Sequence, residues 1–230
     1  MHVKIESKYW KDNQDDIFIN GQTIKRVKDM KYLGIIVDDK LLFKCNIDHL
    51  VKKVSKKIYM LQRLKKKTDC DTRILLYKSL IAPHFDYCSS ILMLANDTDM
   101  ERLQKLQNRA MRIILNAPPR EHIYDLLNKC KLLSVKQRVY YNVLCFMYKA
   151  RMKILPEYIS VMFKTTAESQ PYNLRNNDLL RPPAYRSAAA QNSFQYKGAI
   201  EFNKAIESGV DVNCPFVSFK KIYVNTSKHG

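Results

Sequence analysis

The hydrophobic pattern of this 230-residue chain changes once, near Lys44, and this change constrains the fold more than any other feature. Before it, apolar residues alternate or form the short β-branched runs that are typical of strands. The stretch IFINGQTIKRV places the turn dipeptide Asn20-Gly21 between apolar flanks, and YLGIIV is one such run. After it, apolar residues recur at intervals of three and four, as in amphipathic helices. The sequence therefore predicts an α+β fold, mainly α, in which a small N-terminal antiparallel β-sheet is followed by helices.

Three helical segments are expected in the first half of the chain. Apolar residues from Ile47 to Leu64 fall on one arc at helical spacing, which predicts a single helix. The segment from Thr72 to Ala95 is also apolar, and we expect Pro83 to bend or divide it at residues 81 and 82. The sequence Thr98-Asp99-Met100-Glu101 has the capping-box pattern and predicts a third helix that runs to about Asn116.

Further helices are expected after the proline pair at residues 118 and 119. They cover about 121–130, a stretch from the capping residue Ser134 to about Met152, and 193–208 as the last helical stretch. Residues 164–190 are polar and proline-bearing, which predicts a loop or short extended pieces. The predicted organisation has three regions: β-rich residues 1–43, a helical bundle at 44–117, and a mostly helical region at 118–230 with the polar loop at 164–190.

The charge of the chain predicts a polyanionic partner. Forty Lys and Arg residues stand against 22 Asp and Glu residues, a formal net charge of +18, and 46% apolar content suffices for a core. Nucleic acid is the leading candidate, and an anionic membrane surface is the second. No apolar run approaches the ~18 residues of a membrane span, and the N-terminus has no signal-peptide pattern. We expect an intracellular protein, in the nucleus or the cytoplasm, and the sequence predicts no oligomeric state.

Two predicted helices each carry a row of cations. The run from Lys44 to Lys67 contains nine, and a second row recurs beside the apolar arc of the 98–116 helix at steps of three, four and three. A charge run alone is often only a solvated helix face, but two such rows in one bundle would follow a phosphate backbone without reading bases. The predicted nucleic-acid-binding residues are Lys52, Lys53, Lys56, Lys57, Arg63, Arg102, Lys105, Arg109 and Arg112.

No catalytic or metal-binding pattern emerges from the residues themselves. Neighbouring side chains on a strand point to opposite faces, so Asp38 and Asp39 cannot both hold one ion. The acids at positions 12, 15 and 16 are interpreted as a solvated loop. The five histidines have no nucleophile motif beside them, the five glycines form no phosphate-binding loop, and the six cysteines lack zinc spacing. We expect free thiols, no bound metal and no cofactor.

Four stretches occur in an order that resembles one protein family. They are KYLGIIVDDKLLF, IDHLVKKVSKKIYMLQRL, LLYKSLIAPHFDYCSSIL and ERLQKLQNRAMRIIL. Together they resemble the C-terminal part of a reverse transcriptase from a non-LTR (LINE-type, jockey-like) retrotransposon. The ordered similarity covers about residues 15–117, and Tyr172–Arg175, Ser193-Phe194 and Phe202-Asn203 extend it over nearly the whole chain.

The resemblance implies a role for each region. Tyr32, Leu33 and Gly34 would sit at the primer grip at the end of the palm, residues 44–117 would form the thumb that holds primer and template, and the rest would be the region downstream of the thumb. Asp38 would match a recurrent aspartate after the grip. The catalytic aspartates, their magnesium, the fingers and most of the palm precede this region in the family. The expected chain is a fragment of an RNA-directed DNA polymerase that binds an RNA/DNA hybrid or DNA duplex and is inactive alone.

Alternatives remain open at this point. The chain is expected to be a truncated element, a partial gene model or a domain retained for binding. A different class of function is a non-enzymatic, basic nucleic-acid-binding protein with its own cellular role. A third is attachment to anionic membrane surfaces through the basic face between Lys52 and Lys67.

Overall fold

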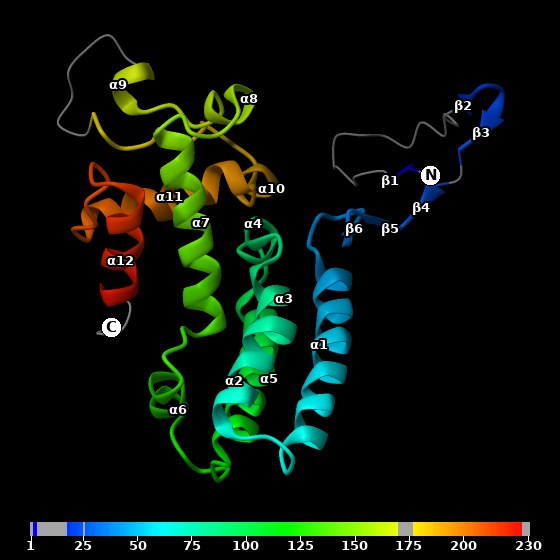
Figure 1. Cartoon of the computed structure of the whole chain (residues 1–230). Coiled ribbons are helices and arrows are strands. Elements are labelled where there is room, and N and C mark those ends of the chain that lie inside the picture. Colours follow the sequence, from blue (N-terminus) through cyan, green and yellow to red (C-terminus); the bar gives the residue numbers. More distant parts are fainter. Residues whose placement is uncertain (1, 4–17, 25, 170–176, 227–230) are drawn as a thin grey trace. The chain divides into compact units, whose positions relative to one another are not determined.

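The computed structural model describes residues 2–3, 18–24, 26–169 and 177–226, and Figure 1 shows its helices and strands. The chain divides into two compact units. Unit 1 comprises Met1–His84 and Ala95–Leu132, and unit 2 comprises Phe85–Leu94 and Leu133–Gly230. The mainly helical α+β class is confirmed. The three regions expected from the sequence, 1–43, 44–117 and 118–230, divide the chain by predicted role, and that division stays a prediction.

Short strands open unit 1. β1 (His2–Val3) pairs in parallel with β4 (Arg26–Val27), β2 (Phe18–Ile19) pairs antiparallel with β3 (Gln22–Thr23), and β5 (Asp29–Tyr32) pairs antiparallel with β6 (Ile35–Asp38). The β2–β3 turn is the predicted Asn20-Gly21 dipeptide, with positive φ at both positions as a tight hairpin turn requires. The strands described here form three separate pairs, where the sequence predicted one small antiparallel sheet.

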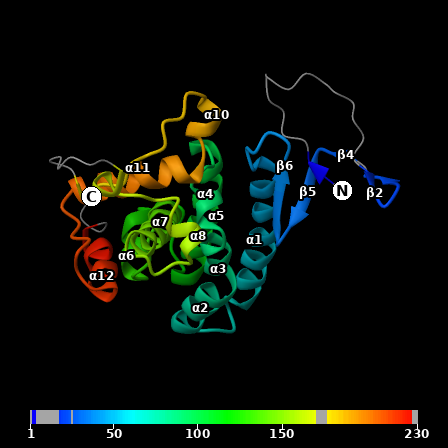
Figure 2. The ribbon, with the colours of Figure 1, turned by 90° about the horizontal axis from the view of Figure 1, so that it is seen from above.

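The β5–β6 hairpin is anchored to the first long helix, α1 (Lys44–Leu64). The Ile36 backbone N–H donates to Asn46 Oδ1 at 3.2 Å, which ties β6 to the first turn of α1. Figure 2 shows the hairpin beside α1. Ile47, Val54 and Ile58 of α1 are buried, as the apolar arc predicted.

Pro83 accounts for the irregular helical segment that follows α1. The chain passes through α2 (Cys70–Leu76), a π-helical turn (Tyr77–Ile81) and α3 (Ala82–Asp86), and α4 (Ser89–Leu92) follows in unit 2. Proline cannot donate the backbone hydrogen bond of a regular helix and crowds the preceding turn, so the change of helix type directly before Pro83 fits its chemistry. The predicted division at residues 81 and 82 is confirmed.

The second long helix of unit 1, α5 (Asp97–Leu115), begins earlier than expected. The side chain of Asn96 caps it by accepting a hydrogen bond from the Asp99 N–H at 2.8 Å. The predicted capping box at residues 98–101 was therefore wrong, because Asn is at least as good an N-cap as Thr and stands two positions before it. The short helix α6 (Ile123–Lys129) follows α5 as predicted.

The core of unit 1 is formed where α1, α5 and the segment from α2 to α3 meet. Leu103, Ala110 and Ile114 on the inner face of α5 are fully buried, and so are Tyr77 and Ile81. Within this core the Gln107 side-chain amide donates to the Tyr77 hydroxyl at 3.0 Å, which satisfies a polar group that burial would otherwise penalise.

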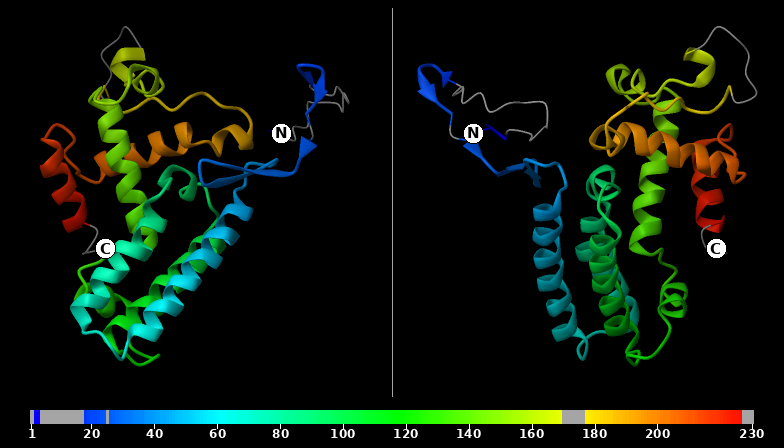
Figure 3. Two further views of the ribbon diagram at one scale, coloured as in Figure 1. Left: turned by 45° about the vertical axis from the view of Figure 1, so that its right-hand side comes forward. Right: turned by 180° about the vertical axis from the view of Figure 1, so that it is seen from behind.

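Unit 2 is built on α7 (Val135–Arg151), which the predicted capping residue Ser134 begins with a complete capping box. Figure 3 shows α11 (Phe194–Glu207) crossing α7 and α12 (Phe216–Thr226) running beside it. Met147, Phe202 and Phe219 from these three helices are fully buried in one cluster. Helix α12 was missed, since residues 193–208 were expected to form the last helical stretch.

Two connections complete unit 2. Arg138 on α7 forms ion-paired hydrogen bonds with Asp86, and Asn142 donates to Asp86 and Ser89, which fixes the segment around α4 against α7. The polar stretch 164–190 contains an isolated bridge between Thr165 and Leu180, and residues 170–176 lie outside the described part. The remaining short helices are α8 (Glu157–Ser160), α9 (Thr166–Ser169) and α10 (Ala188–Gln191).

In the part of the chain that the structure describes, no helix is both long and apolar enough to cross a membrane.

The packing of α5 predicts the result of a core truncation. Leu103 is fully buried, so replacing it with Ala removes buried methyl groups and leaves a cavity. We expect Leu103→Ala to lower the free energy of unfolding by about 2–5 kcal/mol in a urea titration. The control is Leu75→Ala, because Leu75 is 65% exposed and its truncation should change stability little. Equal effects of the two variants would contradict the assignment of the α5 inner face.

Candidate nucleic-acid interface

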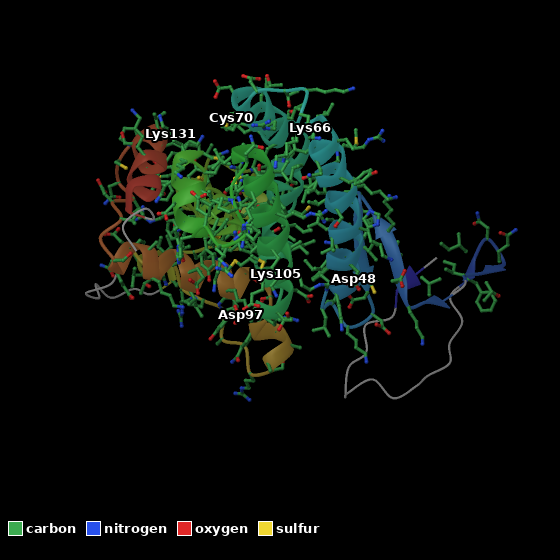
Figure 4. All side chains as sticks on the ribbon, turned by 90° about the horizontal axis from the view of Figure 1, so that it is seen from below. Asp48, Lys66, Cys70, Asp97, Lys105 and Lys131 are labelled. Atoms are coloured by element: carbon green, nitrogen blue, oxygen red, sulfur yellow. The ribbon has the colours of Figure 1, made fainter. Side chains whose placement is uncertain are left out.

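Helices α1 and α5 of unit 1 run parallel and carry all the predicted nucleic-acid-binding residues. Near their starts, Asp48 of α1 accepts a hydrogen bond from Arg102 of α5 at 2.6 Å. At their ends, Arg73 donates to the Lys65 carbonyl at 2.7 Å and to the Ile114 carbonyl at 2.9 Å. Figure 4 shows Asp48 and Asp97 at one end of this pair and Lys66 at the other. Corresponding ends of the two helices therefore lie together.

A groove with a volume of about 480 Å³ lies between the C-terminal halves of these helices, and we call it the α1–α5 groove. None of the described residues that line it is acidic. It is lined by four cations, Lys65, Lys105, Arg109 and Arg112, by the amides Gln62 and Asn108, and by Ile113, Ala117 and Pro119. Cations gathered without acids repel one another and attract an anion, so the groove is suited to a polyanion.

The cations from α5 share one side of the helix because they recur at steps of four and three. Lys105 and Arg109 are exposed, whereas Arg112 is half-buried. The Nε of Arg112 is buried and has no hydrogen-bond partner. A buried donor without a partner carries a desolvation cost.

An amide network orients Asn108 at the groove. The Gln104 side-chain Nε2 donates to Asn108 Oδ1 at 2.8 Å and to Gln107 Oε1 at 2.9 Å. Gln107 is held in turn by Tyr77 in the core. Because the Asn108 oxygen is used in this network, its Nδ2 is the end that can donate to a ligand.

Arg102, the first residue of the predicted α5 row, does not line the groove. Its guanidinium donates to Asp48 at 2.6 Å and to Asp99 at 2.8 Å. Hydrogen bonds to Asp48 and then Asp99 raise the pKa of the Arg102 guanidinium, so both carboxylates favour its charged form. The structure therefore uses Arg102 to join the starts of α1 and α5.

The predicted cations of α1 are divided between two sides of the helix. Lys52, Lys56 and Arg63 are exposed and recur at steps of four and seven, which places them on one ridge. Lys53 and Lys57 instead lie near His84 of α3. Burial lowers the pKa of the His84 imidazole, and the charges of Lys53 and Lys57 lower it further. The nine predicted nucleic-acid-binding residues of α1 and α5 thus do not form a single surface, and their role in binding stays a prediction.

The residues predicted at a primer grip form the turn of the β5–β6 hairpin. Leu33 and Gly34 have φ values of 46° and 85°, the left-handed conformation that a two-residue hairpin turn needs. Tyr32 and Leu33 are 62% and 75% exposed, so this turn presents an aromatic and an aliphatic side chain to solvent.

Asp38 stabilises the chain reversal at the end of β6. Its Oδ1 accepts a hydrogen bond from the Leu42 N–H at 2.9 Å, and its backbone carbonyl accepts one from Leu41 at 3.1 Å. The neighbouring Asp39 uses its backbone N–H to donate to the Lys28 carbonyl at 3.0 Å. Within the described ranges, no three His, Cys, Asp or Glu side chains are grouped so that they could hold a metal ion. The acids at positions 12, 15 and 16 lie outside those ranges.

Sequence reasoning missed three residues that line the groove and one that lies at the helix ends. Lys65 was counted among the cations of its segment but not selected, and Gln62, Asn108 and Arg73 were not considered. The one signal for Lys65 was its spacing of four from Leu61 on the apolar arc, which turns it toward α5. No signal in the sequence identified Arg73, whose partners lie five, eight and 41 residues away.

Comparison with known proteins finds curated relatives that are polymerases of mobile elements. The chain is 27% identical over 101 residues to the probable RNA-directed DNA polymerase from transposon X-element of Drosophila melanogaster, covering 43% of this chain and 11% of that protein. It is 29% identical over 105 residues to the RNA-directed DNA polymerase from mobile element jockey of Drosophila funebris, covering 44% and 12%. The jockey polymerase of Drosophila melanogaster is 23% identical over 154 residues, covering 66% and 17%.

The chain spans less than a fifth of the length of the curated relatives it matches. No protein-family model matches it, and no solved structure does. The curated homologues of this chain are RNA-directed DNA polymerases of jockey and X-element non-LTR retrotransposons, and the family resemblance predicted from its motifs is confirmed.

Proposed function

We propose that this chain is the grip, thumb and downstream part of a non-LTR retrotransposon reverse transcriptase, and that it holds nucleic acid by phosphate contacts in the α1–α5 groove. The polymerase names of the curated relatives support the first half of this proposal. The substrate would be an RNA/DNA hybrid or a DNA duplex. Magnesium and the catalytic aspartates would belong to the palm of such an enzyme and not to these residues.

The observation that carries the binding proposal is the composition of the groove. Lys65, Lys105, Arg109 and Arg112 converge there from two helices without an acid among the lining residues. Lys and Arg neutralise phosphates and release the counterions that condense on nucleic acid, which drives binding of any sequence. Lys52, Lys56 and Arg63 on the outer ridge of α1 would extend the contact along the backbone.

The hairpin turn at Tyr32–Gly34 would supply a second contact of a different kind. Its exposed Tyr32 and Leu33 can pack against a sugar or a base, since aromatic rings stack on bases without selecting their sequence. The hairpin is tied to α1 through Asn46, so it is held in unit 1 together with the groove.

Substituting the groove cations tests the binding proposal. We expect the combined variant Lys105→Gln, Arg109→Gln and Arg112→Gln to weaken duplex binding and to flatten its dependence on salt. Each lost phosphate contact should reduce the slope of log K against log salt concentration by about 0.9 for duplex DNA. Fluorescence anisotropy with a labelled duplex at several salt concentrations measures this slope.

Arg102→Gln is the matched comparison, because Arg102 is paired with Asp48 and Asp99 and lies outside the groove. It should leave the slope close to that of the unmodified chain. A triple variant with an unchanged slope would remove the groove from the interface, and a slope lowered equally by Arg102→Gln would mean that the whole α5 row contacts phosphates.

The pKa of His84 is sensitive to charge on the side of α1 that carries Lys53 and Lys57. The ammonium groups of Lys53 and Lys57 contribute to the lowered pKa of His84, so replacing both lysines with Gln should raise that pKa toward its ordinary value. We expect a duplex bound in the groove to leave the His84 pKa unchanged, as measured by NMR titration of its ring protons. If the duplex raised it as the lysine substitutions do, phosphates would lie against Lys53 and Lys57, and the interface would extend to this side.

The proposal also predicts the outcome of a polymerase assay. The purified chain, given magnesium, a homopolymer template and an annealed primer, should bind the primer-template but incorporate no nucleotide. The reason is that two-metal phosphoryl transfer needs a carboxylate cluster that holds both ions. Template-dependent incorporation that vanished in an Asp38→Asn variant would refute the assignment of Asp38 to chain reversal.

A further inference from the structure

Arg73, on α2, is a buried cation at the point where α1 and α5 end. It is 5% exposed. Its Nη1 donates to the carbonyls of Lys65 and Thr68 at 2.7 and 2.8 Å, and its Nε donates to the carbonyl of Ile114 at 2.9 Å. Among the described residues no carboxylate forms an ion pair with it. A buried guanidinium thus has backbone carbonyls as its partners.

Two of these carbonyls, those of Lys65 and Ile114, belong to the C-terminal ends of two parallel helices, and the third, that of Thr68, belongs to the turn after α1. The last carbonyls of a helix lack partners within the helix, and they carry the negative end of its dipole. Because α1 and α5 run parallel, two negative helix ends lie side by side. The fork of Arg73 satisfies carbonyls from both ends at once, and its charge opposes both dipoles.

The same two helix ends form one part of the α1–α5 groove. Gln62 and Lys65 come from the end of α1, and Arg112, Ile113 and Ala117 come from the end of α5 and the residues after it. The separation of these ends sets how far Lys65 lies from Arg112. Without compensation, the two negative helix ends would also oppose a phosphate in the groove.

We propose that Arg73 is a positioning residue for phosphate binding: it holds the ends of α1 and α5 together and neutralises them, so that the groove cations act on a phosphate at full strength. This inference rests on the proposed function. Arg73 does not line the groove, so it would act on a bound phosphate through the helix ends and not by contact.

The first test is made without nucleic acid. It examines the hydrogen bonds of Arg73 to the ends of α1 and α5, which we call the junction. Arg73→Lys keeps a charge but loses the planar fork that reaches both helix ends. Hydrogen exchange measured by mass spectrometry should show faster exchange in peptides that cover 61–68 and 111–117 in this variant, with little change in peptides that cover 44–52 and 97–102. Arg186→Lys, at an exposed position in unit 2, is the matched control and should change neither. Unchanged exchange at both helix ends in Arg73→Lys overturns the inference.

The second test is a double-mutant cycle on duplex binding at low salt. We expect about tenfold weaker binding for Arg73→Met, which removes the charge at the helix ends, and about threefold weaker binding for Arg73→Lys, which keeps it. In the Lys105→Gln, Arg109→Gln background, the further loss from either change should fall below about twofold, because two of the four cations that line the groove are gone. If Arg73→Met does not fold by circular dichroism, Arg73→Lys decides the result.

The outcomes separate the inference from the proposed function. A loss of equal size in both backgrounds means that Arg73 acts on stability alone, which overturns the inference while groove binding stands. The inference is also overturned, and groove binding still stands, if Arg73→Lys binds duplex with wild-type affinity while the double variant Lys105→Gln, Arg109→Gln binds it more weakly. An unmodified chain that bound no duplex would overturn the proposed function and the binding role of Arg73 with it, whereas hydrogen exchange would still establish the junction.

Discussion

The parallel packing of α1 and α5 is the constraint on which the rest of unit 1 depends. Parallel helices place like ends of their dipoles together, which is unfavourable unless charges compensate for them. At the N-terminal ends the carboxylates of Asp48 and Asp99 meet Arg102. At the C-terminal ends Arg73 binds carbonyls of both helices. Acids thus gather where the helix ends are positive, and cations gather where they are negative.

This polarity explains why only part of the α5 cation row lines the groove. Arg102 lies beside the N-terminal ends, where its charge is taken up by two carboxylates. Lys105, Arg109 and Arg112 lie progressively further from those acids and line the groove with Lys65. A polyanion would therefore be attracted to the C-terminal half of the helix pair and repelled from the acids at its start. The charges that compensate the helix dipoles, and so allow α1 and α5 to pack in parallel, also leave the groove cations at the end of the pair that is far from the acids.

Local signals in the sequence predicted the local structure well. The turn at Asn20-Gly21, the interruption before Pro83 and the capping residue Ser134 were each found where steric or hydrogen-bonding rules required them. The start of α5 was misplaced because Thr98 was taken as the cap, although Asn96 stands two positions earlier and is at least as good an N-cap. Helix α12 was missed because its apolar residues pack on α7, and that distant contact leaves no clear period in a short segment. Arg73 was missed for the same reason, since its partners are backbone atoms.

A run of lysines in the sequence does not define a surface. Lys52 and Lys53 are neighbours in the chain, yet helical geometry turns them to different sides of α1, and Lys53 lies with Lys57 near His84. Whether each cation is free for a phosphate then depends on what the rest of the fold places beside it: two carboxylates beside Arg102, and other cations beside Lys105 and Arg109. Charge spacing alone therefore predicts that a basic protein attracts nucleic acid, but the packing of α1 against α5 decides which of its cations line the α1–α5 groove.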